Sequence, residues 1–167
     1  MSLAYTASWA TRVKVLTALV TAILAGEAIL VSVIAACRPQ ISPLLVPLRW
    51  AFLAVLGLTA LFTVRGYSLE NGYLKVRRLF WTTDISLDGL SRVTRRPGAL
   101  RITVKGYGNG GLFAILGWRF VDGVGWCRAF ATNPGSPVIL ECDAGNYIVT
   151  PDDPESFVED ARQWIAR

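Results

Sequence analysis

Few residues of this sequence are equipped for bond-making chemistry. The chain has no histidine, and its three cysteines, Cys37, Cys127 and Cys142, show no CxxC spacing. Because protein zinc sites are built mainly from cysteine and histidine, this composition disfavours a metal site. Cys127 and Cys142 fall in strand-like stretches, where buried free thiols and a disulfide between them both stay open.

The common catalytic patterns are missing as well. The glycine-rich stretch at 108–111 is not followed by the GK[ST] of a phosphate-binding loop, and no GxSxG elbow occurs. Asp152 and Asp153 precede a helical pattern, where a carboxylate serves as an N-terminal cap. The sequence therefore predicts a protein that is not an enzyme and that uses no metal and no cofactor.

Charge is the chemistry that this sequence does carry, and it is concentrated in one segment. Residues 65–105 hold nine basic and three acidic residues, whereas residues 106–167 hold four basic and eight acidic residues. A basic segment directly after an apolar region suits an anionic membrane surface better than nucleic acid. A solvated sheet face is the alternative interpretation. The candidates for contact with a membrane surface or a lipid headgroup are Arg65, Lys75, Arg77, Arg78, Arg95 and Arg96.

Two long apolar stretches near the N-terminus predict membrane-spanning helices, at about residues 15–36 and 44–64. Each is long enough to cross the roughly 30 Å hydrocarbon layer of a bilayer. The connector CRPQISP predicts a tight turn, so residues 1–64 should form a two-helix transmembrane hairpin. Lysine and arginine flank the outer ends of both stretches, and the connector holds only Arg38, so we expect both termini in the cytoplasm.

Glu27 and Arg49 are the polar residues expected inside the membrane, where an isolated charge is costly. Counted from the turn of the hairpin, they are offset by four residues, which is about 6 Å of helix rise. Long side chains can bridge part of that distance, within one hairpin or between two protomers. Alternatively, Glu27 is protonated and faces a helix neighbour, while Arg49 extends its charge toward the outer surface.

From residue 65 onward the pattern changes to short strands and turns. Asn71-Gly72 and Asp122-Gly123 are typical of hairpin turns, and alternating residues over 73–81 predict one long strand. At the end of the chain, apolar residues at helical spacing predict an amphipathic helix over about 153–166. We therefore expect an α+β fold, in which residues 65–167 form an antiparallel barrel or sandwich of about seven strands closed by the final helix.

The stretch GNGGLFAILGWRF at 108–120 is too apolar for an ordinary loop. Trp118 and Phe120 alternate with Arg119, which indicates that a strand has already begun. The residues that need an explanation are Leu112, Phe113, Ile115 and Leu116. Burial in the core, insertion into the membrane interface and contact with another protein are the three interpretations.

Three features together resemble bacterial membrane proteins with a pleckstrin-homology (PH) domain. They are the two apolar stretches, GNGGLF at 108–113, and YIVTPDDPESF at 147–157 leading into the last helix. The resemblance implies a PH-like fold, attachment to the bacterial cytoplasmic (inner) membrane by two spans, and no catalytic activity. A fold alone does not identify a ligand.

The function expected from these observations is that of a membrane-anchored, non-catalytic PH-like binding module. It would interact with the lipid bilayer, through the anionic cytoplasmic surface or a lipid headgroup, and not with nucleic acid. The alternative is a scaffold that forms a homo-oligomer or binds another membrane protein through its apolar segment at 112–120.

Overall fold

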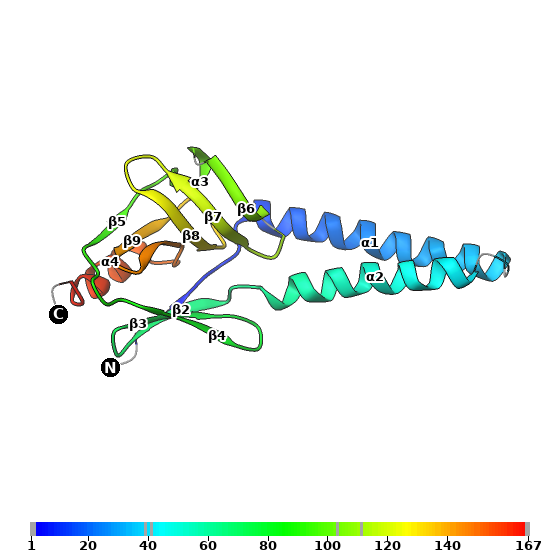
Figure 1. Ribbon diagram of the computed structural model, residues 1–167, viewed down its shortest axis with the longest axis horizontal. Helices are drawn as coiled ribbons and strands as arrows, with labels where there is room; N and C mark the ends of the chain where they lie inside the picture. Colours follow the sequence, from blue (N-terminus) through cyan, green and yellow to red (C-terminus); the bar gives the residue numbers. More distant parts are fainter. Residues whose placement is uncertain (1–2, 39, 41, 103, 111, 166–167) are drawn as a thin grey trace.

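The computed structural model describes residues 3–38, 40, 42–102, 104–110 and 112–165. They form a body of two β-sheets from which a pair of helices extends, as Figure 1 shows. Helix α1 spans Thr11–Cys37 and helix α2 spans Ser42–Leu61, and the two run antiparallel along each other. The expected α+β class, with an apolar N-terminal helix ahead of a strand-rich body, is confirmed.

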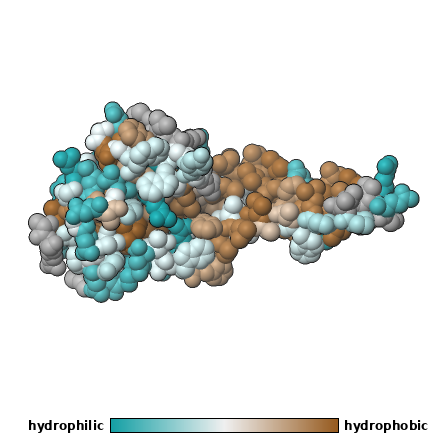
Figure 2. Space-filling model, in the orientation of Figure 1, coloured by the Kyte–Doolittle hydropathy of each residue, from teal (hydrophilic) through white to brown (hydrophobic). Residues whose placement is uncertain are grey.

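Both helices are apolar on every side, which is typical of helices in an apolar environment. On the face that Figure 2 shows, brown surface runs along the helices, with hydrophilic residues at their far tip and on the body. Among the described residues, α1 is long and apolar enough to cross a membrane, while the apolar part of α2, Leu45–Leu61, is shorter. The exposed apolar side chains include Val15, Leu19, Ile23, Ile29, Leu30 and Val33 on α1, and Val55 and Leu58 on α2.

The first sheet has the order β1-β2-β3-β4 and is antiparallel. Its strands are β1 (Leu3–Thr6), β2 (Gly66–Glu70), β3 (Tyr73–Arg77) and β4 (Thr82–Ser86). The predicted turn at Asn71-Gly72 is present, with positive φ angles of 51° and 79°. Strand β1 was not predicted, because its four residues carry a weak pattern and its partner β2 follows only after both helices.

The second sheet has the order β5-β9-β10-β8-β7-β6. Its strands are β5 (Arg92–Arg95), β6 (Val104–Gly110), β7 (Ile115–Val121), β8 (Gly125–Ala131), β9 (Val138–Cys142) and β10 (Gly145–Val149), and a short helix α3 (Ala99–Ile102) precedes β6. Strands β8 and β10 are parallel, so the expectation of a wholly antiparallel sheet is wrong. The cause is the β9–β10 hairpin, which folds back so that β10 lies between β9 and β8.

The main core lies between the two sheets and beneath the last helix, α4 (Pro154–Arg162). Asp153 caps α4 as expected, because its side chain accepts a hydrogen bond from Ser156 N at 3.1 Å. Phe157 is fully buried and faces the ring of Tyr67, so α4 closes the body from one side. The fold is consistent with a PH-like domain.

The cysteines are free in this structure, so a disulfide between Cys127 and Cys142 is not formed. Both are buried, and burial raises the pKa of each thiol to about 11. Cys37, in contrast, is exposed at the far end of α1.

Candidate functional site

A short linker at residues 7–10 joins β1 to α1, and the body holds it by hydrogen bonds. Asp152 accepts hydrogen bonds from Thr6 Oγ1 at 2.6 Å, from Ser8 N at 2.8 Å and from Ser8 Oγ at 2.9 Å. Burial opposes the ionisation of Asp152, but these hydrogen bonds prevail and lower its pKa. The role of Asp152 is therefore to fix the linker, while Asp153 caps α4.

Thr132, which follows β8, holds the same linker from the second sheet. Its Oγ1 donates to Ser8 O at 3.1 Å, and its carbonyl accepts from Ala10 N at 3.2 Å. Its own N–H donates to the buried Thr150 Oγ1 at 2.8 Å. Because β1 leads into α1 and the neighbouring β2 follows α2, both helices leave the body from adjacent strands. This arrangement holds one end of the body beside the helices. We call this end the junction face, and it comprises residues 7–10, 62–65, 77–81 and 112–113.

A cavity of about 570 Å³ lies at the junction face, between the linker that precedes α1, the last turn of α2 with the residues after it, the β3–β4 turn and the loop before β7. Most of its lining is apolar, and Arg65 is its charged residue. We call it the junction cavity, and its lining residues are Ala7, Trp9, Ala60, Thr63, Val64, Arg65, Leu79 and Phe113.

The apolar loop that precedes β7 packs against the helices and the core. Phe113 has a φ of 62°, its N–H donates to Thr17 Oγ1 of α1 at 2.9 Å, and its ring meets Trp9 edge to face at 6.0 Å. Ile115 and Leu116 already belong to β7, where Ile115 is buried and the half-buried Leu116 packs on the main core. Leu112 is half-buried. The loop therefore connects the body to the N-terminal part of α1.

The turn between β3 and β4 forms the other half of the junction face. Strand β3 ends at Arg77, not at Trp81 as predicted, and Phe80 and Trp81 lie in the turn with exposed fractions of 76% and 39%. The turn lies next to α2, because the ring of Trp81 meets that of Phe62 edge to face at 5.4 Å. Sequence analysis missed these two aromatics as surface candidates. The sequence Leu79-Phe80-Trp81 is apolar at a point where the chain must turn. An apolar turn of this kind could have indicated that the two aromatics are exposed at the surface.

Arg78 ties this turn to the end of α2. Its Nε donates to Thr83 Oγ1 at 3.0 Å and its Nη1 donates to Phe62 O at 3.2 Å. The guanidinium also lies 5.4 Å from the centroids of the Phe62 and Phe130 rings. Burial lowers the pKa of Arg78, and the nearby charge of Arg128 lowers it further.

The other basic candidates do not form one surface. Arg65 and Arg77 are exposed beside the end of α2, where Arg65 N donates to Arg77 O at 2.8 Å. Lys75 is paired with Glu70 at 2.8 Å. Arg95 of β5 pairs with Glu155 of α4, and Figure 1 shows these two elements on the side of the body away from the helices.

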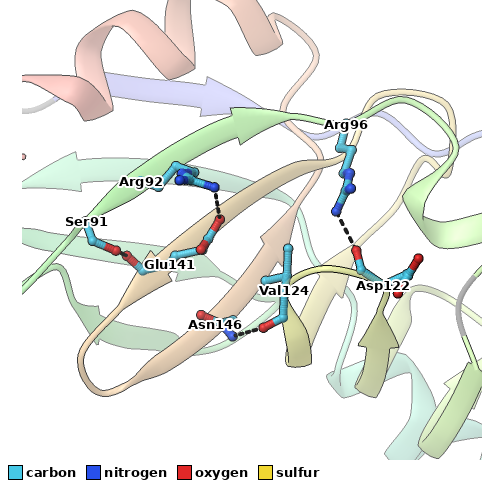
Figure 3. A network of polar contacts seen from close by, with 7 residues as sticks. All are labelled: Ser91, Arg92, Arg96, Asp122, Val124, Glu141 and Asn146. Carbon is cyan, nitrogen blue, oxygen red and sulfur yellow. Dashed lines mark hydrogen bonds and ion pairs between the residues drawn. The ribbon is translucent and has the colours of Figure 1, made fainter.

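Arg96 also lies on that distant side. Figure 3 shows its Nη1 donating to Asp122 O at 2.7 Å, near the ion pair between Arg92 and Glu141 at 4.0 Å. These contacts hold β5 to the second sheet and to the β7–β8 turn. The basic residues at the junction face are thus Arg65, Arg77 and Arg78.

Glu27 and Arg49 do not form an ion pair within the described chain. Arg49 Nη1 donates to Ser32 Oγ at 3.2 Å, and its guanidinium lies 5.2 Å from the Trp50 ring. Glu27 is exposed. Five residues separate Glu27 from Ser32, so its side chain lies about 140° around α1 from the face that meets Arg49.

Two sheets around a core closed by a final helix define a PH-like module. Within the described residues, no three His, Cys, Asp or Glu side chains are grouped so as to hold a metal ion. Residues 65–165 match the family model described as "Bacterial PH domain", which is more than half of the 167 residues. The chain therefore belongs to the bacterial PH-domain family. No curated protein and no solved structure matches it. PH domains are in general non-catalytic binding modules.

Proposed function

We propose that this protein is a membrane-anchored, non-catalytic binding module of the bacterial inner membrane, whose junction face contacts the cytoplasmic leaflet. The observation that carries this proposal is the gathering of exposed aromatic and arginine side chains at the junction face, beside helices with an exposed apolar surface. Aromatic rings favour the boundary between membrane and water, and arginines attract anionic headgroups. In this arrangement α1 and α2 cross the bilayer, and both chain ends are cytoplasmic.

The lengths of the two helices fit this arrangement. The 20 residues of α2 correspond to about 30 Å, the thickness of the hydrocarbon layer. The 27 residues of α1 correspond to about 40 Å, so its ends extend into the headgroup regions or the helix tilts. Arg12 and Lys14 are exposed on the first turn of α1, where they would reach the cytoplasmic headgroups.

A weak surface interaction is sufficient in an anchored domain. Each basic residue near an anionic surface contributes about 1 kcal/mol. Because the helices keep the body next to the bilayer, its effective concentration at the surface is high. Three arginines and two exposed aromatics would therefore orient the body without a tight ligand site.

A fluorophore at position 80 tests contact with the leaflet. The full-length Phe80→Cys protein, in a Cys37→Ser background, is labelled with an environment-sensitive dye and reconstituted into vesicles. We expect blue-shifted emission and protection from an aqueous quencher when the vesicles contain anionic lipid, and less protection at high salt. The same dye at Glu159→Cys, an exposed position of α4 away from the helices, should stay accessible. Equal quenching at both positions would contradict contact between the junction face and the membrane.

The native Cys37 tests the two-span topology. Cys37 is exposed at the end of α1 farthest from the body, whereas Cys127 and Cys142 are buried with raised pKa values. A membrane-impermeant maleimide added to intact spheroplasts should therefore modify Cys37 from outside. Modification only after the cells are lysed would place Cys37 inside and reject the two-span arrangement.

Self-association is the second candidate function, and an open aromatic face favours it. Trp118, Phe120 and Trp126 lie on the same face of β7 and β8 with exposed fractions of 48%, 39% and 52%. Trp118 and Phe120 belong to the apolar segment at 112–120, for which a protein contact was the alternative interpretation. If this face joins two copies, Trp118→Ser should lower the molar mass of the full-length protein measured by light scattering in detergent.

A further inference from the structure

We propose that the junction cavity binds one membrane phospholipid, with its phosphate at Arg65 and its glycerol and upper acyl carbons against the apolar walls. This inference rests on the proposed function, because it takes the helices to span a bilayer. It goes further in assigning a discrete site to a single lipid molecule, apart from contact with the membrane surface.

The position of the junction cavity suits a lipid. The cavity lies where α2 ends, which is the level of the cytoplasmic headgroups if α2 spans the hydrocarbon layer. Its floor is formed by buried residues of the linker and of the segment after α2, among them Ala7 and Val64. The β3–β4 turn contributes Leu79, and the loop before β7 contributes Phe113. Four separate segments thus line a hollow of about 570 Å³ that is open to its surroundings.

The walls of the cavity are held in place by contacts already described. Phe113 is fixed by its hydrogen bond to Thr17 and by the ring of Trp9. Leu79 belongs to the turn that Arg78 binds to the end of α2. Most of the lining is apolar, so an apolar group that covers it removes apolar surface from water. Beside a bilayer, an acyl chain is the apolar group at hand.

Arg65 supplies the charge that selects a phospholipid over an uncharged lipid. Its backbone is fixed, since its N–H donates to Arg77 O at 2.8 Å. Its side chain is exposed at the rim of the cavity, and among the described residues it forms no ion pair. A guanidinium binds a phosphate by two parallel hydrogen bonds, which an ester carbonyl of a lipid cannot match.

Native mass spectrometry of the full-length protein in a non-ionic detergent tests this site. Four probes are added separately, namely phosphatidylglycerol, phosphatidylcholine, a diacylglycerol with the same chains, and inorganic phosphate. We expect one phospholipid per chain to survive detergent removal in the gas phase, and neither diacylglycerol nor inorganic phosphate to do so. Arg65→Gln should weaken phospholipid retention roughly 10-fold, as expected for the loss of charge-assisted hydrogen bonds.

Two matched pairs of variants separate the site from general effects. Ala60→Phe fills the cavity from α2 and should abolish retention, whereas Ala51→Phe changes an exposed position of the same helix and should not. Arg162→Gln removes an exposed arginine of α4, outside the junction face, and should retain the lipid. Melting temperatures show which variants are folded, and Arg65→Gln gives a second test if Ala60→Phe is not.

Undiminished lipid retention by a folded Ala60→Phe protein would reject the cavity as the site, and equal retention of diacylglycerol would reject the role of Arg65. Binding of inorganic phosphate alone would indicate an anion site without a lipid. If Cys37 is labelled from outside but no lipid is retained, this inference fails while the proposed membrane anchoring stands.

Discussion

Replacing Phe157 by alanine is expected to lower the free energy of unfolding of the body by about 3–5 kcal/mol, the usual cost of emptying a buried phenylalanine site. Phe157 is fully buried, and its ring meets the rings of Tyr5 at 5.1 Å and Tyr67 at 6.4 Å. It therefore joins α4 to β1 and β2, the two strands that carry the helices. Thermal or urea unfolding of the detergent-solubilised protein, followed by tryptophan fluorescence, measures the change.

The control for this prediction is the same substitution at an exposed position. Phe80 is 76% exposed, so Phe80→Ala should change the free energy of unfolding by no more than about 0.5 kcal/mol. The contrast between the two variants separates core burial from a membrane-facing surface. Equal destabilisation by both variants would mean that the β3–β4 turn is part of the core. That result would contradict the exposed position of Phe80.

Features that depend on neighbouring residues could be predicted from the sequence. The cap of α4 at Asp153, the turn at Asn71-Gly72 and the apolar face of the last helix are all local, and the structure contains each of them. The long apolar helix α1 was predicted for the same reason, since its signal is a continuous run of apolar residues.

Features that depend on distant pairing could not be predicted. Strand β1 has four residues, and it becomes a strand because β2, which follows α2, offers an edge for hydrogen bonding. The parallel alignment of β8 and β10 results from how the β9–β10 hairpin docks. Neither pairing leaves a periodic signal in the sequence, because each is fixed by packing of the whole body.

For the candidate site, the sequence identified the types of residue that could contact a membrane, but not how they are arranged in space. Sequence analysis selected arginines by their position after the apolar region, but only tertiary structure separates Arg77, beside α2, from Arg95, which pairs with Glu155 on the distant side. For Glu27 and Arg49, the sequence gives the offset along the helix axes. It does not show toward which neighbour each side chain points. The face of α1 that meets Arg49 is known only from the contact between Arg49 and Ser32 in the structure, and Glu27 lies about 140° around the helix from Ser32.

Reversing the charges of Arg65 and Arg77 is expected to release the body from an anionic membrane surface. Both side chains are exposed at the junction face. If each arginine contributes about 1 kcal/mol of attraction, replacing two of them by glutamate changes the surface interaction by about 4 kcal/mol, since attraction is lost and repulsion is added. The dye at position 80 should then report a water-exposed turn in anionic vesicles, the result also expected for the protein without the two charge reversals in neutral vesicles or at high salt.

The matched control reverses two arginines on the distant side of the body. Arg92 and Arg162 are exposed, and Arg92→Glu with Arg162→Glu changes the net charge of the protein by the same amount. The two double variants differ in the position of the charge and in the loss of the exposed ion pair between Arg92 and Glu141, so melting temperatures are compared as well. If both release the dye to the same extent, the attraction is a property of total charge and not of the junction face. If only Arg65→Glu with Arg77→Glu does so, the helices and the linker at residues 7–10 act together to hold one chosen face of the body toward the lipid.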